Sequence, residues 1–160
     1  MAHRFWLFKT EPTTYSIDDL AKLGTDHWDG VRNYQARNFL RDDIKPGDHV
    51  FIYHSRVEPM AIMGLAQVTR GGYPDHTQFD PKSAHPDPKS SSNNPRWFMV
   101  DIKLVEKFKH PLTLSAMRAV PGLENMMLLQ KGSRLSIQPV SEKEAEILLA
   151  LVKSSSDKPC

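Results

Sequence analysis

Residues 28–38, WDGVRNYQARN, combine side chains that can stack on a planar ring with others that can hydrogen-bond to its edge. Trp28 offers a large flat face, and Gly30 lets the backbone come close to a ligand. Asn33 carries both a donor and an acceptor, which the edge of a heterocyclic base requires. A segment that only filled a core would not need so many polar groups beside its aromatic residues. The run is typical of a recognition loop that leads into a helix.

Aromatic and hydroxyl side chains elsewhere could complete the walls of a pocket. Trp97 begins a strand directly after a long loop, and Tyr53 and Ser55 share one face of another strand. Each tryptophan also has a plain interpretation as a core residue, and Asn33 could simply bond to the start of a helix. The candidate ligand-binding residues are Trp28, Val31, Asn33, Tyr34, Tyr53, Ser55 and Trp97.

Basic side chains near these segments could hold the phosphates of a nucleic acid. Arg37 and Arg41 are about one turn apart on the expected helix and share a face. A solvated helix face explains these two arginines without any ligand. The candidate phosphate contacts are Lys9, Arg32, Arg37, Arg41 and Arg96.

The chain lacks the motifs of common catalytic and cofactor sites. It has no glycine-rich phosphate loop, no dinucleotide fingerprint, no His-Glu-x-x-His and no Cys-x-x-Cys. Its seven histidines are scattered without the spacing of metal ligands, so neither a metal nor a cofactor is expected. His54 and Ser55 point to opposite faces of a strand and cannot act as a base and nucleophile pair. We therefore expect no catalytic residues.

The overall composition is typical of a small soluble protein. The 160 residues suit one domain, and a net charge of +2 excludes a strongly basic nucleic-acid binder. No apolar run approaches the roughly 20 residues that span a bilayer, and the N-terminus does not resemble a signal peptide. A cytoplasmic location is expected, or a nuclear one in a eukaryote. The single cysteine, Cys160, cannot form an internal disulfide.

Helix signals are clearest near the two ends of the chain. Ser16 can cap a helix that ends at Gly24, and a capping box from Ser141 to Glu144 opens an amphipathic helix. The expected helices are residues 16–23, 34–40, 113–120, 125–130 and 141–152, and a disordered tail is expected over 153–160.

Strands are expected where apolar residues alternate or run together. They are residues 5–9, 49–55, 61–68, 97–105 and 135–140. Residues 70–95 are rich in glycine, proline and serine and are expected to form a long functional loop. Strands scattered among short helices indicate an α+β fold with a small, mostly antiparallel β-barrel, forming one domain over residues 1–152.

Seven ordered segments resemble those of EVE-domain proteins, which belong to the PUA-like superfamily together with the YTH readers of methylated RNA. They extend over residues 5–152, and together they are far more specific than any one motif. The segments read FWLFKTEP, WDGVRNYQARN, YHS, YPD, QFDP, PRW and GSRLS.

The resemblance implies an open β-barrel flanked by helices, with a pocket for a modified nucleobase. Members of the family are associated with 5-methylcytosine and 5-hydroxymethylcytosine in DNA. We therefore expect a non-catalytic, monomeric reader that flips such a base into an aromatic pocket, with DNA favoured over RNA.

Other functions stay open at this point. An enzyme acting on a modified nucleobase or nucleotide would need a general base, for which His54 or Asp29 is the nearest choice. A protein-interaction module could use the long loop over residues 71–94. An RNA-binding module of the same superfamily is a further alternative.

Overall fold

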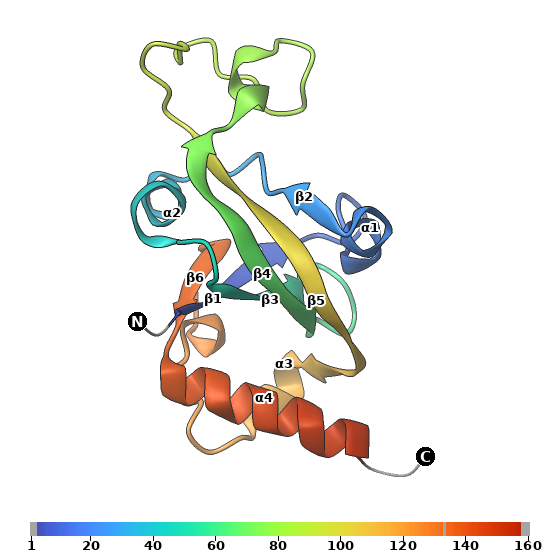
Figure 1. Ribbon diagram of the computed structural model, residues 1–160. Helices are drawn as coiled ribbons and strands as arrows, with labels where there is room; N and C mark the ends of the chain where they lie inside the picture. Colours follow the sequence, from blue (N-terminus) through green and yellow to red (C-terminus); the bar gives the residue numbers. More distant parts are fainter. Residues whose placement is uncertain (1–2, 133, 158–160) are drawn as a thin grey trace.

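A six-stranded sheet forms the centre of the molecule (Figure 1). In this computed structural model, which describes residues 3–132 and 134–157, the strand order is β2-β5-β4-β3-β1-β6. Neighbours are antiparallel except β1 and β3, which are parallel. The two strands at the ends of this order, β2 and β6, each pair with one neighbour, so the sheet is open. The predicted α+β class is confirmed. The strands are β1 (Phe5–Thr10), β2 (Thr25–His27), β3 (His49–His54), β4 (Ala61–Pro74), β5 (Phe98–Thr113) and β6 (Ile137–Val140).

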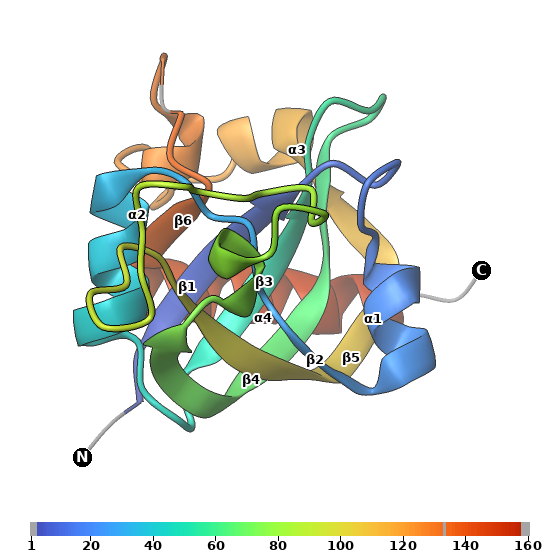
Figure 2. The ribbon, with the colours of Figure 1, turned by 90° about the horizontal axis from the view of Figure 1, so that it is seen from above.

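Helices cover both faces of the sheet. In Figure 2, α1 and α2 lie on the viewer's side of the sheet and α4 crosses behind it. A π-helical turn over Phe39–Asp43 continues α2, and short 3-10 turns form at His76–Phe79 and Met127–Leu129. The α-helices are α1 (Ile17–Leu23), α2 (Tyr34–Asn38), α3 (Leu114–Arg118) and α4 (Glu142–Asp157).

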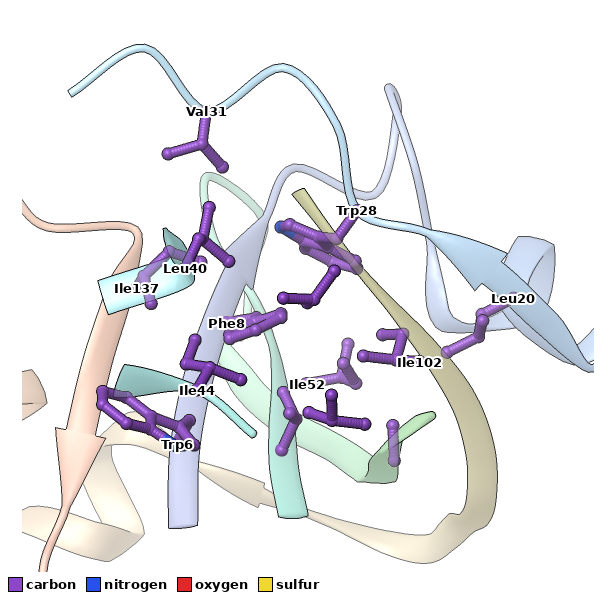
Figure 3. Close-up of a cluster of buried hydrophobic side chains, with 14 of the residues drawn as sticks. Trp6, Phe8, Leu20, Trp28, Val31, Leu40, Ile44, Ile52, Ile102 and Ile137 are labelled. Atoms are coloured by element: carbon purple, nitrogen blue, oxygen red, sulfur yellow. The ribbon is translucent and has the colours of Figure 1, made fainter. Parts of the chain in front are cut away.

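Two hydrophobic clusters fill the space on the two faces of the sheet. Trp6 and Phe8 of β1 enter one cluster, whereas Leu7 between them enters the other. This alternation follows from the two-residue period of a strand. Because both faces of β1 are buried, its sequence is a continuous apolar run rather than an alternating one. Figure 3 shows the first cluster, in which Trp28 lies next to Phe8.

Ser16 caps helix α1, as the sequence predicts, and it does so in a complete capping box with Asp19. The Ser16 hydroxyl accepts from the Asp19 amide at 3.2 Å, and the Asp19 carboxylate accepts from the Ser16 amide at 2.8 Å. The amide of Ile17 donates to Nε2 of His54 at 3.1 Å. That bond fastens the start of the helix to the end of β3 and requires a neutral imidazole.

We expect the free energy of unfolding to fall below about pH 6.5, in part through His54. Burial lowers the pKa of this imidazole in the folded protein, so the unfolded chain takes up the proton more readily. The contribution of His54 is therefore present above the unfolded pKa of about 6.5 and is lost as pH falls through the lower folded pKa. One such group gives a slope of at most about 1.4 kcal/mol per pH unit.

Urea titrations of the parent and His54→Gln between pH 5 and pH 8 measure this contribution. The glutamine oxygen can still accept from Ile17, so the variant is expected to show a weaker dependence on pH. An identical pH dependence in the two proteins would contradict the assignment.

Strands β4 and β5 are longer than the sequence indicated. β4 continues to Pro74 rather than ending at 68, and β5 continues to Thr113 rather than ending at 105. Gly71 and Gly72 suggested a loop, but Gly72 serves a close packing contact. A Cβ at this position would clash with the backbone carbonyl of Leu40. The loop expected over 70–95 therefore begins after Pro74 and contains a 3-10 turn.

Other boundaries differ near the chain ends. The short edge strand β2 was not expected, and α4 runs to Asp157 instead of ending at Val152, so much of the expected tail is helical. The rest of that tail, including Cys160, lies outside the described residues. Within the described part of the chain, none of the helices has the length and apolar character needed to cross a bilayer.

Candidate functional site

A cavity of about 480 Å³ opens beside the end of β1 and the segment that follows β2. This volume lies within the range of about 300–1,000 Å³ that is usual for small-molecule pockets. Its wall mixes aromatic, hydroxyl, acidic and basic side chains. The lining residues are Lys9, Thr10, Glu11, Thr14, Tyr15, His27, Trp28, Asp29, Gly30, Val31, Arg32, His85 and Ser136.

Trp28 carries the largest aromatic ring of this wall. Its ring packs against Phe8 at a centroid distance of 5.2 Å and against the edge of Tyr15 at 5.7 Å. Its amide donates to the carbonyl of Val100 at 2.8 Å, which fixes the backbone to β5. Trp28 is 8% exposed, and the exposed part of the residue borders the cavity. The interpretation of Trp28 as a core residue is therefore confirmed, and its role as a stacking surface stays a prediction for the part that lines the cavity.

A buried carboxylate, Asp75, holds the rim of the cavity in place. Its Oδ2 accepts from the Gly30 amide at 2.8 Å and from Nη1 of Arg32 at 3.0 Å. Its Oδ1 accepts from the Thr77 amide at 2.8 Å. Burial would raise the pKa of Asp75, but the hydrogen bonds from Thr77, Gly30 and Arg32 outweigh burial and keep the pKa below its usual value. The rim therefore depends on an ionised carboxylate inside the protein.

Arg32 is engaged inside this network. Besides Asp75, its guanidinium donates to the carbonyl of His85 at 2.6 Å and to the hydroxyl of Thr77 at 3.1 Å. This internal role differs from the phosphate contact predicted from the sequence. Arg32 instead fastens the loop that carries His85 to the segment that carries Trp28.

Gly30 has a structural reason to be glycine. Its φ is 80°, and a Cβ here would come within 2.6 Å of the His85 ring. Because Gly30 has no side chain, the imidazole of His85 can pack directly against its backbone. This ring lines the cavity and narrows it from the side of the long loop.

Polar groups at fixed positions face the cavity from several elements. Thr10 donates its hydroxyl to the carbonyl of Tyr15 at 2.8 Å, and Tyr15 donates to Asp26 at 2.7 Å. Burial and the bond to Asp26 raise the pKa of Tyr15 well above its usual value, so the phenol keeps its proton. Asp29 is half-buried and has no hydrogen-bond partner on its carboxylate among the described residues. It can accept from an amino group of a bound molecule.

Tyr53 and Ser55 lie on the other side of the sheet from Trp28, contrary to expectation. The parallel pairing of β1 and β3 places Phe8 beside Ile52 and Lys9 beside Tyr53. Paired residues share a face, so Tyr53 falls opposite the face that Phe8 shares with Trp28. Tyr53 is 2% exposed and belongs to the second hydrophobic cluster.

The remaining aromatic candidates form a separate pair, in which the exposed ring of Tyr34 covers the buried ring of Trp97. Tyr34 and Trp97 stack at a centroid distance of 4.9 Å, and Nε1 of Trp97 donates to Asp87 at 2.6 Å. Neither ring lines the cavity. Trp97 anchors the long loop to the start of β5 and does not provide the second wall that the sequence suggested.

Asn33 acts as the N-cap of α2. Its Oδ1 accepts from the Ala36 amide at 3.0 Å, and the side chain is directed to the helix rather than into the cavity. The alternative drawn from the sequence, bonding at the helix start, describes it correctly.

Asn33→Ala is expected to lower the free energy of unfolding by about 1 kcal/mol, the usual cost of losing such a cap. We expect no change in what the cavity selects. Chemical denaturation and ligand titration of the same variant measure both effects. Asn33→Asp, which preserves the cap, serves as the control, and a loss of ligand selectivity in Asn33→Ala alone would contradict the capping role.

The other predicted cations lie away from the cavity, except Lys9. Arg37 donates to the carbonyl of Arg96 at 2.7 Å, and its guanidinium lies 5.0 Å from the ring centre of Tyr34. Arg41 pairs with its neighbour Asp42 at 2.8 Å. Lys9 lines the cavity, and burial lowers its pKa.

The sequence prediction missed the residues that complete the cavity from distant parts of the chain. Tyr15, His85 and Ser136 are separated by more than fifty positions and line the cavity together, and Asp75 fixes its rim through Gly30. Asp75 had a local signal, because an aspartate bonding to the amide two residues later is a common turn device. No comparable signal marks His85. Among the described residues, no group of three or more His, Cys, Asp or Glu side chains could hold a metal ion.

The fold and this cavity define a protein of the EVE class. A family model described as the EVE domain matches residues 4–151, and the chain belongs to this family. The chain is 42% identical to thymocyte nuclear protein 1 of Homo sapiens over 165 residues, covering 91% of this chain and 72% of that protein.

Solved structures of similar proteins have the same fold. A protein of Leishmania major aligns with a TM-score of 0.91 and 41% identity, covering 97% of this chain and 98% of that one. A protein of Pseudomonas putida gives 0.88 and 44%, covering 92% and 99%. Human THYN1 protein, in a crystal structure with DNA containing 5-methylcytosine, gives 0.87 and 39%, covering 98% and 99%.

Proposed function

We propose that this protein is a non-catalytic reader of modified cytosine in DNA, with 5-methylcytosine or 5-hydroxymethylcytosine as the favoured base. The base leaves the duplex and enters the cavity beside Trp28. The observation that carries the proposal is this cavity, which joins an aromatic face to fixed polar groups. A similar protein, human THYN1, has been crystallised with DNA containing 5-methylcytosine, which supports the choice of ligand.

The energetics of base extrusion fit such a cavity. Unstacking and unpairing a base costs a few kcal/mol. Stacking on an aromatic side chain returns about 1–3 kcal/mol, and hydrogen bonds to the base edge return more. If the cavity offered only Trp28, the free energy gained by stacking would only about equal the cost of extruding the base. The polar wall is needed for net binding.

The cavity offers partners for both parts of a modified cytosine. The carboxylate of Asp29 can accept from the exocyclic amino group, the pairing that acidic side chains make with cytosine. Val31 is 7% exposed and, with Trp28, supplies apolar surface for a methyl group. A methyl group in an apolar pocket discriminates by about 10–200-fold. The protein is therefore expected to prefer the methylated base without fully excluding unmodified cytosine.

The placement of His54 favours binding over catalysis. This candidate general base accepts a hydrogen bond from the Ile17 amide and is absent from the cavity wall. Asp29 does line the cavity, but none of its neighbours there repeats a known base and nucleophile arrangement. Turnover of a modified nucleotide by the purified protein would overturn this part of the proposal.

The test is a titration of fluorescent oligonucleotides that differ in one base. Matched DNA duplexes carry cytosine, 5-methylcytosine or 5-hydroxymethylcytosine, and an RNA of the same sequence is the fourth ligand. We expect at least one modified duplex to bind about tenfold or more tightly than the unmodified one. Equal affinity for all three duplexes would refute the proposal, and preference for the RNA would favour the RNA-binding alternative.

A further inference from the structure

A second cavity, of about 620 Å³, lies on the opposite face of the sheet and shares Lys9 with the first. It is bounded by the ends of β1 and β3, by α3 and by the segment over residues 128–132. Tyr53 and Ser55, which the sequence placed beside Trp28, belong here instead. The lining residues are Lys9, Tyr53, Ser55, Met60, Leu114, Arg118, Leu128, Leu129, Gln130, Lys131 and Gly132.

The charges of the two cavities differ in kind. The first carries Glu11 and Asp29 as well as Lys9 and Arg32. The second carries three cations, Lys9, Arg118 and Lys131, and its described lining includes no Asp or Glu. It is a concave surface of one sign, suited to an anion.

Two of these cations are not used inside the protein. Arg118 and Lys131 are exposed, and neither has a hydrogen-bond or ion-pair partner within residues 3–132 and 134–157. Arg41, by contrast, is paired with Asp42, and Arg32 with Asp75. Arg118 and Tyr53 line the same cavity, and the charge of Arg118 partly offsets the rise in the pKa of Tyr53 that burial causes. Arg118 therefore faces the cavity with its donors uncommitted.

Lys9 connects the two cavities because of its place at the end of β1. Its pairing with Tyr53 directs it to the face of the second cavity, and it also borders the first cavity beside Thr10. Lys9 therefore borders both the candidate base cavity and the cationic cavity.

We infer that the second cavity binds a backbone phosphate of DNA next to the extruded nucleotide, through Arg118, Lys131 and Lys9. This inference rests on the proposed function. A phosphodiester offers charged acceptor oxygens, and guanidinium and ammonium groups are their usual partners. The base cavity gives selectivity and the cationic cavity gives affinity that is independent of the base.

The test compares Arg118→Gln and Lys131→Gln with two matched controls, Arg70→Gln and Lys153→Gln, which remove the same charges at exposed residues that line neither cavity. Each protein is titrated with the 5-methylcytosine and cytosine duplexes over a series of salt concentrations. We expect Arg118→Gln and Lys131→Gln each to bind both duplexes about tenfold more weakly, with the ratio between duplexes unchanged. The slope of log K against log salt should become shallower by about one. The controls should stay within about twofold of the parent.

The outcomes separate this inference from the proposed function. If the parent selects the modified duplex and both cavity variants match it in affinity and salt slope, the inference is wrong and the proposed function stands. If a variant changes the ratio of the affinities for the two duplexes but not the slope of log K against log salt, the mutated residue contacts the base rather than a phosphate. That result would also overturn the inference. If the parent does not select a modified duplex, the proposed function fails, and the inference fails with it.

Discussion

Trp28→Ala is expected to bind a 5-methylcytosine duplex no more tightly than an unmodified one. The substitution removes the largest aromatic ring that lines the cavity. Stacking on an aromatic side chain contributes about 1–3 kcal/mol per base, which corresponds to roughly 5–150-fold in affinity. Because extrusion costs a similar amount, the variant should no longer extract the base. Fluorescence anisotropy with both duplexes measures the change.

A stability control is needed because most of the Trp28 ring is buried. Removing a buried tryptophan side chain costs about 3–5 kcal/mol of unfolding free energy. Leu20→Ala offers a comparable loss in the same hydrophobic cluster, at a residue that does not line the cavity. Measured where both variants are folded, Leu20→Ala should keep the selectivity of the parent. Full selectivity in Trp28→Ala would contradict the assignment of the cavity.

Asp75→Ala is expected to lower the free energy of unfolding by about 3–5 kcal/mol. The carboxylate is fully buried and accepts from Gly30, Arg32 and Thr77, so its removal leaves the Arg32 guanidinium without its ion-pair partner. The rim of the cavity should also lose its fixed position, which would weaken binding of the modified duplex. Urea denaturation and duplex titration of the same variant measure the two effects.

Asp80→Ala provides the comparison for Asp75→Ala. This exposed carboxylate lies in the same segment and accepts one hydrogen bond, from the amide of Lys82 at 2.9 Å. Its loss should cost no more than about 1 kcal/mol. Equal stability changes in the two variants would mean that the buried ion pair does not organise the rim.

The fold was predictable where local chemistry and burial agree. The helix cap at Ser16, the strand at Phe5 and the closing strand before α4 each carry a clear signal, and the structure confirms them. The lengths of β4 and β5 were not predictable, because the unexpected part of each strand is largely exposed and that of β4 contains Gly71 and Gly72. Their pairing with each other supplies the stabilisation that the sequence pattern does not display.

The site was predictable only where its residues are neighbours in the sequence. Trp28 and Val31 were chosen from one segment, and the fold brings both to the cavity. Tyr53 and Ser55 were assigned to the wrong side of the sheet. Their side depends on the parallel pairing of β1 with β3, which joins residues more than forty positions apart. Period-two alternation tells which residues share a face but not which face meets a given helix or loop.

The central claim is that the modified base lies against Trp28, and indole NMR resonances test it most directly. The chain has three tryptophans: Trp6 donates its indole N–H to Asp48, and Trp97 donates to Asp87. On titration with the 5-methylcytosine duplex, the Trp28 indole signal should shift most, with a smaller shift for the unmodified duplex. Saturated binding that leaves Trp28 unmoved and shifts Trp97 instead would contradict the account and place the contact at the Tyr34–Trp97 surface.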